Sequence, residues 1–289
     1  MARIRKAVIP VAGMGTRFLP ATKAIPKELL PIVDKPVIQY IVEEAIQSGI
    51  EEIIFITNDK KFAIQEHFSR NEELERILDE KNKPDQLSAV REMCDLAKFV
   101  YVPQNEPLGL GHAVLQAREL IGEEPFIVFG GDDIVEAEVP AARQLIDVFN
   151  KYGGSVLGVH AVPRERCDHY GVVSLTEDLG NGINSIDDVI EKPAIDEAPS
   201  NLAVGGRWLL TSGIFTHLER TKPGAGGEIQ LTDAIKALMA DEQMHSKTYD
   251  GIYRDCGNKV EYVKAMISFA IKHEEVGESV RKYIQSIMV

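Results

Sequence analysis

Apolar runs that end in glycine turns constrain the fold of this chain more than any other feature. Residues 7–12 form one such run and residues 126–129 another, and each is followed directly by glycine. β-Rich runs at residues 53–57 and 99–103 lie between them and alternate with helix-like stretches. Such short apolar runs are typical of strands buried on both faces, and their alternation with helices predicts βαβ units around a parallel sheet.

Helix signals fill the spaces between these strands. An amphipathic segment opens at Pro36 and ends at Gly49, the stretch 60–97 is polar and helix-rich, and residues 113–121 form a further helical segment. Proline at the start of a helix and glycine just past its end are the usual boundary residues.

The pattern becomes more mixed after Asn150. There we expect strands at residues 155–162, 171–175, 186–190 and 202–210, and helices at residues 229–240, from Val260 onward and at residues 274–288. The sequence predicts an α/β fold with a Rossmann-like, mixed but mainly parallel central sheet, a smaller β-rich part and C-terminal helices. We interpret residues 1–289 as one domain, with internal divisions near residues 150 and 257. The terminal helices are expected to contact a second subunit in a homodimer or homotetramer.

Charge and cysteine content restrict the partners and the compartment. The formal net charge of −13 disfavours nucleic acid and membrane as partners, because both attract basic surfaces. Cys94, Cys167 and Cys256 are too few and too scattered for a disulfide framework or a zinc site, so we expect a reducing, cytoplasmic environment. No apolar run approaches the ~20 residues that span a bilayer. We interpret the basic residues before residues 7–12 as preceding a first strand, not as part of a signal peptide.

The strongest chemical signal is the loop after the first strand, Gly13-Met-Gly-Thr-Arg17, which Pro26-Lys27 follows. Its two glycines let the backbone approach a polyphosphate, whose oxygens successive N–H groups can bind. Arg17 offers two donors to a phosphate, and Lys27 offers a point charge. The loop lacks the third glycine of the dinucleotide-binding pattern and the ending of a P-loop. A tight turn with surface cations is the structural alternative.

A second glycine turn follows the run at residues 99–103. Gln104 precedes Leu108-Gly-Leu-Gly-His112, which opens a helix. The Gln104 side chain has both a donor and an acceptor, as reading a nucleobase edge requires, and Gly109 and Gly111 leave room for a flat base. A helix-start loop without a ligand is the alternative.

The third turn, Gly130-Gly-Asp132-Asp133, follows the run at residues 126–129. A carboxylate at the end of a strand and beside phosphates is a hard oxygen ligand suited to Mg²⁺. We favour Asp132 as this ligand and expect Asp133 to point elsewhere. Two adjacent acids in an ordinary turn are the alternative.

All three turns follow strands of the same predicted parallel sheet. Ligands of open α/β sheets bind outside the carboxyl ends of the strands, near a switch in strand order. We therefore expect the first glycine loop, Gln104 and Asp132 to meet in one crevice.

Three constellations in the second half offer groups for a further substrate. Glu191 and Lys192 adjoin at a predicted strand end, where Glu191 is suited to sugar hydroxyls and Lys192 to a phosphate. Glu228 follows a glycine turn that enters a helix and is a candidate sugar ligand, and Asp255 supplies a second carboxylate before another helix. A surface ion pair, a capped helix start and an Asp-Gly turn are the respective alternatives.

Taken together, these stretches resemble the sugar-nucleotide pyrophosphorylases, and within them the bacterial branch that transfers a uridylyl group to glucose 1-phosphate. The similarity covers nearly the whole chain and is most specific over residues 11–28. Shorter matching stretches lie at residues 109–113, 170–173, 191–193, 199–203, 227–233 and 255–259.

The resemblance implies UTP and glucose 1-phosphate as substrates, UDP-glucose and pyrophosphate as products, and Mg²⁺ as cofactor. It implies a nucleotide-binding half before residue 150 and a sugar-phosphate-binding half after it. The expected nucleotide-binding residues are Ala12, Gly13, Gly15, Thr16, Gln104 and Gly109, with the backbone of Ala12 and Gly13 and the side chain of Gln104 on uracil. The other implied roles are the triphosphate for Arg17 and Lys27, Mg²⁺ for Asp132 and Asp255, glucose for Gly171, Glu191 and Glu228, and the glucose phosphate for Lys192.

Three other functions compete with this hypothesis. A thymidylyl- or guanylyltransferase of the same fold is the nearest, since thymine differs from uracil by one methyl group, which a pocket discriminates by ~1–3 kcal/mol. A catalytically silent relative would have lost Arg17, Lys27, Asp132 or Asp255, all of which are present. An NAD-dependent oxidoreductase is disfavoured by the missing third glycine.

Overall fold

The computed structural model describes residues 3–224 and 227–287. Within these residues, a nine-stranded sheet has the order β5-β4-β1-β6-β11-β8-β12-β10-β9, and β13-β7 and β2-β3 form two small separate pairs. Ala225 and Gly226 of the predicted turn before Glu228, and Met288 of the predicted last helix, lie outside the described residues.

The strands are β1 Lys6–Pro10, β2 Pro31–Ile32, β3 Lys35–Pro36, β4 Glu52–Thr57, β5 Lys98–Pro103, β6 Phe126–Phe129, β7 Asp133–Glu136, β8 Val156–Ala161, β9 Gly171–Gly180, β10 Ile183–Glu191, β11 Leu202–Leu210, β12 Met244–Thr248 and β13 Ile252–Asp255. The helices are α1 Val37–Gln47, α2 Phe62–His67, α3 Glu72–Glu80, α4 Pro84–Cys94, α5 Leu110–Leu115, α6 Arg118–Ile121, α7 Ala141–Tyr152, α8 Ile214–Leu218, α9 Leu231–Leu238, α10 Lys259–Lys272 and α11 Gly277–Ile287.

The half of the sheet formed by β5, β4, β1 and β6 is parallel, as predicted. Successive residues of these strands enter different cores: Val8 packs in one apolar cluster, whereas Ala7 and Ile9 pack in the other. Both faces of β1, β4 and β6 are therefore buried, which explains why these runs are mostly apolar at successive positions instead of at alternate ones, whereas the edge strand β5 is only partly buried. The order β4-β1-β6 also places a switch in strand order beside β1.

Beyond β6 the sheet is mixed, because β11 runs antiparallel to both β6 and β8. β12 is parallel to β8, while β10 is antiparallel to β12 and to β9. The expected mixed sheet is confirmed, and its parallel pairs are concentrated in the first half of the chain. Strands from both predicted halves join one continuous sheet.

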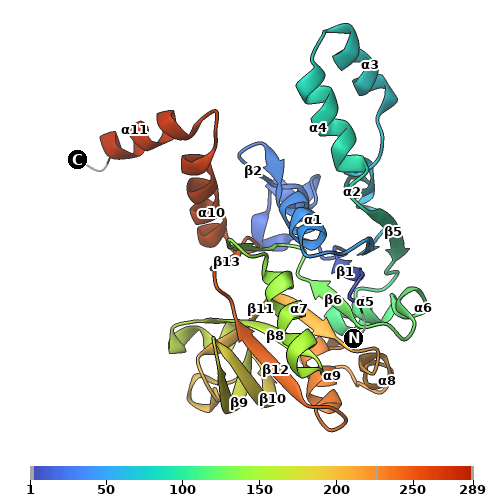
Figure 1. Cartoon of the computed structure of the whole chain (residues 1–289), viewed down its shortest axis with the longest axis vertical. Helices are drawn as coiled ribbons and strands as arrows, with labels where there is room; N and C mark the ends of the chain where they lie inside the picture. Colours follow the sequence, from blue (N-terminus) through green and yellow to red (C-terminus); the bar gives the residue numbers. More distant parts are fainter. Residues whose placement is uncertain (1–2, 225–226, 288–289) are drawn as a thin grey trace.

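Helices cover both faces of the sheet (Figure 1). α1 and α7 bury their apolar residues in one cluster, and α5, α8 and α9 bury theirs in the other. The α3–α4 hairpin and α11 project from the body (Figure 1). Over the described residues, no helix combines the length and apolar character that crossing a bilayer requires.

The predicted helix at residues 113–121 differs from the structure in its start. It begins at Leu110 and is divided into α5 and α6. Gly109 precedes it with a φ of 105°, a conformation that favours glycine, so the extended loop turns into the helix earlier than expected.

Candidate active site

The loop after β1 is folded onto Lys27. Gly15 has a φ of 64°, and a Cβ built on it would lie 3.1 Å from the Cβ of Lys27. The Thr22 hydroxyl donates to the Gly15 carbonyl at 2.7 Å. The Lys27 ammonium in turn donates to Asp132 Oδ2 at 2.6 Å. The loops that follow β1 and β6 therefore meet at the Lys27–Asp132 ion pair.

The electrostatics of Lys27 keep it charged. Burial lowers the pKa of its ammonium, but the charges of Asp132 and Glu28 and the hydrogen bond to Asp132 outweigh burial and raise this pKa overall. Glu28 is fully buried beneath the loop, where Lys61 donates to its two oxygens at 2.9 and 2.7 Å. Burial raises the pKa of Glu28 and lowers that of Lys61. Lys27 is thus a cation at neutral pH, and the buried ion pair between Glu28 and Lys61 holds the loop that carries it.

The loop after β5 docks against the second half of the chain. The buried Gln104 amide donates to the Gly109 carbonyl at 3.2 Å and lies 3.0 Å from His112 Nδ1. The Gly111 N–H donates to the Ile229 carbonyl at 2.9 Å. A Cβ built on Gly109 would lie only 2.8 Å from the Cβ of Glu228. Glycine is therefore required for this close approach.

These two loops border a cavity of about 430 Å³, which we call the Gln104 cavity. The predicted residues that line it are Ala12, Gly13, Lys27, Gln104, Gly109, Asp132 and Glu228. Gly15 and Thr16 do not line it; the former makes the turn against Lys27, and the latter begins a 3₁₀ turn that extends to Phe18.

Asp132 and Asp255 are brought together by the pairing of β7 with β13. Asp133 lies opposite Asp255 in this pair, and the Cys256 N–H donates to the Asp132 carbonyl at 2.9 Å. A Cβ built on Gly257 would lie 2.3 Å from Asp132 Oδ2 and 3.0 Å from Asp255 Oδ1, so the two carboxylates surround one small space. Burial and then the charge of Asp132 raise the pKa of Asp255.

This donor set fits a hard divalent cation. Oxygen ligands suit Mg²⁺, which proteins usually hold through one or two carboxylates together with water and substrate phosphates. Residues 3–224 and 227–287 contain no group of three or more acidic, histidine or cysteine side chains placed to hold a metal.

The carboxylate of Asp133 lies beside the Tyr253 hydroxyl and the backbone of Gly130 and Gly206. It accepts a hydrogen bond of 2.5 Å from the Tyr253 hydroxyl, and a Cβ on Gly130 or Gly206 would lie about 2 Å from its Oδ2 (1.9 and 2.2 Å). Arg207 donates to the Asp133 carbonyl at 2.9 Å. Burial, reinforced by the neighbouring acids, raises the pKa of Asp133 to about 7. Asp133 therefore supports the backbone that carries Asp132.

A larger cavity of about 720 Å³, the Lys192 cavity, lies beside the first. The predicted residues that line it are Arg17, Lys27, Asp132, Gly171, Glu191, Lys192, Glu228 and Asp255. Lys27, Asp132 and Glu228 thus line both cavities. The crevice expected at the tips of β1, β5 and β6 is present, and the Lys192 cavity adjoins it.

The acid and base at the end of β10 are held by different contacts. Thr232 donates to Glu191 Oε2 at 2.7 Å, and a Cβ on Gly171 would lie 3.3 Å from that oxygen. Lys192 has a φ of 46°, which is strained for a lysine, and its N–H donates to the Tyr170 carbonyl at 2.9 Å. Its exposed ammonium lies 3.6 Å from Glu191 Oε1. Backbone strain of this kind persists only where the surrounding structure fixes the conformation, and it is common at functional sites.

Several residues of the Lys192 cavity carried no role in the sequence prediction. Arg166 and Tyr170 enter from a 3₁₀ turn and the residue before β9, Trp208 from β11 and Thr232 from α9. Tyr170 and Thr232 lie inside stretches that resemble the family, so the sequence could have indicated them as site residues. Arg166 lies outside every such stretch, so only the fold reveals its position.

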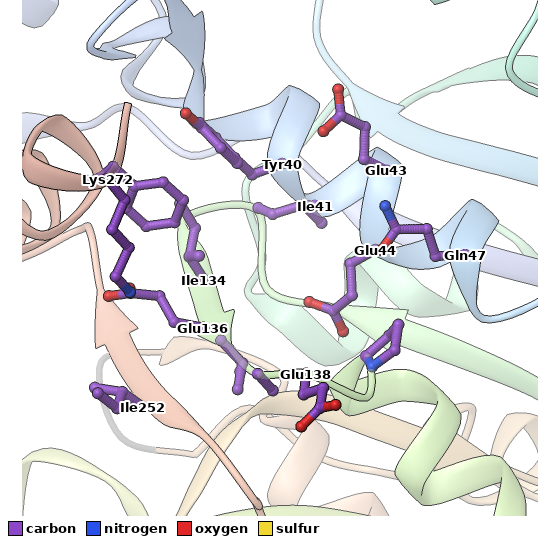
Figure 2. A pocket seen from close by; sticks show the side chains of 14 residues that line it. Tyr40, Ile41, Glu43, Glu44, Gln47, Ile134, Glu136, Glu138, Ile252 and Lys272 are labelled. Atoms are coloured by element: carbon purple, nitrogen blue, oxygen red, sulfur yellow. The ribbon is translucent and has the colours of Figure 1, made fainter. Parts of the chain in front are cut away.

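A third cavity of about 470 Å³, the Glu136 cavity, lies at the other end of the β7–β13 pair, where Ile252 is opposite Glu136 (Figure 2). Tyr40 and Glu44 of α1 and Lys272 of α10 also line it. Lys272 donates to Glu136 at 2.8 Å. None of the predicted site residues lines this cavity.

Comparison with known proteins identifies the family of this chain. The family model for nucleotidyl transferases matches residues 6–270, and the chain belongs to that family. Within it, the chain is 49% identical over 287 residues to UTP–glucose-1-phosphate uridylyltransferase of Staphylococcus haemolyticus, a match that covers 99% of each protein.

Two solved structures are similar over nearly the whole chain. One is the UTP-bound UGPase from Acinetobacter baumannii, with a TM-score of 0.91, 39% identity, and coverage of 98% of this chain and 99% of that one. The other is a UDP-glucose pyrophosphorylase complexed with UDP-glucose, with a TM-score of 0.86, 39% identity, and coverage of 94% and 100%.

Proposed function

We propose that this chain transfers a uridylyl group from UTP to α-D-glucose 1-phosphate and releases UDP-glucose and pyrophosphate. One observation carries the proposal: the Gln104 cavity and the Lys192 cavity meet at Lys27 and Asp132. A nucleotide in the first cavity and a sugar phosphate in the second would place their phosphates at this shared point. The relatives named for this reaction support the choice of substrates.

The reaction is a substitution at the α-phosphorus of UTP. A phosphate oxygen of glucose 1-phosphate attacks this phosphorus, the bond to the oxygen bridging the α- and β-phosphates breaks, and pyrophosphate leaves with that bonding electron pair. The acceptor phosphate is ionised at neutral pH, so no residue has to remove a proton. Catalysis then depends on positioning and on stabilising negative charge.

Charge repulsion between the substrates is the main obstacle. Two unit charges ~4 Å apart interact by about 4 kcal/mol at an effective dielectric constant of 20. Lys27 lines both cavities, and Arg17 and Lys192 line the Lys192 cavity. We assign Arg17 and Lys27 to the triphosphate and Lys192 to the acceptor phosphate. These cations offset the repulsion and hold the attacking oxygen in line.

We propose Mg²⁺ as the cofactor, held by Asp132 and Asp255. The metal would neutralise phosphate charge. Ala12, Gly13 and Gln104 would bind uracil, and Gly171, Glu191 and Glu228 would bind glucose.

A substrate panel tests the proposal. UTP, dTTP, GTP and ATP are each combined with glucose, galactose and mannose 1-phosphates, and pyrophosphate release is measured with and without Mg²⁺. We expect UTP with glucose 1-phosphate to have the highest kcat/KM. A higher value for dTTP or for GTP with mannose 1-phosphate would assign the chain to another branch, and no release from any pair would leave it without this activity.

We also propose a homodimer or homotetramer formed through the terminal helices. Val260, Val263 and Ile267 are exposed at helical spacing on α10, and Tyr283 and Ile287 are exposed on α11. An apolar stripe of this kind is typical of a buried subunit contact. Light scattering should show a multimer that Val263→Glu weakens, and a monomeric wild-type protein would contradict the proposal.

The cytoplasm is the compartment that we propose. Cys94, Cys167 and Cys256 are free thiols, as a reducing compartment keeps them. Fractionation of cells that express the full chain would test this assignment, and recovery with secreted proteins would contradict it.

A further inference from the structure

Arg166 stands out among the cations of the Lys192 cavity. The positively charged side chains that line this cavity are Arg17, Lys27, Arg166 and Lys192. Lys27 pairs with Asp132, and Lys192 lies beside Glu191. Within residues 3–224 and 227–287, neither Arg17 nor Arg166 forms an ion pair, and the one side-chain hydrogen bond of Arg166 goes from Nη2 to the Tyr170 hydroxyl at 3.2 Å. Arg17 is assigned above to the triphosphate, so Arg166 is the cation of this cavity that has no assigned ligand. In a chain with a net charge of −13, a half-buried guanidinium without a carboxylate partner is available to bind an anionic ligand.

Tyr170 links this guanidinium to Lys192. Its hydroxyl accepts from Arg166, and its carbonyl accepts from the Lys192 N–H at 2.9 Å. Arg166 and Lys192 therefore both contact Tyr170, and both line the Lys192 cavity, although they lie on different elements. Arg166 does not line the Gln104 cavity, so it is separated from the nucleotide base.

A phosphate is the ligand that fits this guanidinium. The planar fork of arginine binds two phosphate oxygens at once, and lysine adds a point charge, so the two side chains complement each other. Sugar hydroxyls are neutral and are better matched by carboxylates such as Glu191 and Glu228 in the same cavity.

We propose that Arg166 binds the phosphate of the sugar 1-phosphate together with Lys192, an assignment that rests on the proposed function. After transfer, this phosphate becomes the β-phosphate of UDP-glucose. Arg166 therefore contributes to the binding of the acceptor and of the product, and it does not contribute to the binding of UTP.

Arg166→Gln and Arg166→Lys test the assignment, and Arg164→Gln is a matched control. Arg164 lies two residues away on the same turn, is exposed, donates to the Ala198 carbonyl at 2.9 Å and does not line the cavity. Dissociation constants of UDP-glucose and UTP are measured by calorimetry, and KM is measured for each substrate. Thermal melting followed by circular dichroism verifies that each variant is folded.

We expect Arg166→Gln to raise the KM for glucose 1-phosphate and the Kd for UDP-glucose about 10- to 100-fold, the loss typical of a charged hydrogen-bonded contact. The Kd for UTP should stay within about 2-fold of the wild-type value. Arg166→Lys should lose less affinity, because it keeps the charge without the fork. Arg164→Gln should behave as wild type.

Unchanged UDP-glucose affinity in the folded Arg166 variants would overturn the inference, and so would an equal loss for UTP and UDP-glucose. Turnover of the wild-type protein reports on the proposed function separately. An inactive wild-type protein whose UDP-glucose binding still depends on Arg166 would refute the function and retain the phosphate site.

Discussion

A buried ion pair connects α1 to the strand beside the active site, and its removal should be costly. Arg207 is 0% exposed and Glu44 is 10% exposed. Arg207 donates to Glu44 Oε1 at 2.9 Å and to Oε2 at 2.6 Å, and it also donates to the carbonyls of Gly206 and Asp133. The perturbation we consider is Arg207→Met, which replaces the guanidinium with a shorter, unbranched apolar side chain and removes every side-chain donor.

The magnitude follows from what the substitution leaves behind. The Glu44 carboxylate would stay buried, with the Ala142 N–H at 3.0 Å as its remaining donor. Removal of one partner from a buried ion pair costs ~3–5 kcal/mol because the other charge is left uncompensated. That loss is a large part of the ~5–15 kcal/mol that stabilises a typical protein. Adding Glu44→Leu removes the stranded charge, so the double variant should recover most of the loss.

Urea unfolding measures these free energies. Circular dichroism follows the helices, and the fluorescence of Trp208, the single tryptophan of the chain and the next residue after Arg207, follows the site. We expect the order wild type, double variant, Arg207→Met in decreasing stability. If Arg207→Met lost less than ~1 kcal/mol, or if the double variant were less stable than either single variant, the argument from an uncompensated charge would be wrong.

Three further predictions concern the metal ligand, a glycine and a histidine. Asp132→Asn should abolish most Mg²⁺-dependent pyrophosphate release while circular dichroism stays unchanged, and near-normal turnover would reject this ligand. Gly206→Ala should destabilise the protein by about 2 kcal/mol or more in thermal melting, because its φ is 67° and the new Cβ would lie 2.2 Å from Asp133 Oδ2. The control Gly153→Ala has a φ of 75° with no atom within 4 Å, so it should lose only the backbone strain of about 1 kcal/mol, and equal losses would contradict the clash. Burial and then the charge of Arg166 lower the pKa of His160 to about 4 in the folded protein. As the pH falls from about 6.5 to 4, His160 therefore binds a proton in the unfolded chain but not in the folded one, which favours unfolding. Over that window the wild type should lose up to ~3 kcal/mol of stability relative to His160→Gln in urea titrations, and parallel profiles would refute the shift.

The parallel half of the fold was readable from the sequence because its signals are local. Residues 53–56 and 126–129 are apolar at every position, as expected of strands covered on both faces, and glycine directly follows the runs at residues 7–12 and 126–129. Gln104 and Asp132 could be assigned to one crevice because parallel strands end at the same edge of a sheet. Family resemblance then supplied the roles in the second half.

The strands β7, β12 and β13 were not predicted. They are four or five residues long, and β12 carries the mostly polar sequence Met-His-Ser-Lys-Thr, which is buried because it lies between β8 and β10 and packs against α7. Strands this short are defined by their pairing partners far along the chain and not by their own composition.

The sequence by itself determined the βαβ half, the three glycine turns and the residue types that meet there, because periodicity and backbone conformation are local properties. Only the tertiary structure decided that Asp255 lies beside Asp132, and that Lys27, Arg166 and Lys192 line the same cavity. The pairs Asp132–Asp255, Lys27–Arg166 and Lys27–Lys192 are separated by 123, 139 and 165 positions in the sequence, and loop closure over such separations depends on the packing of the whole chain.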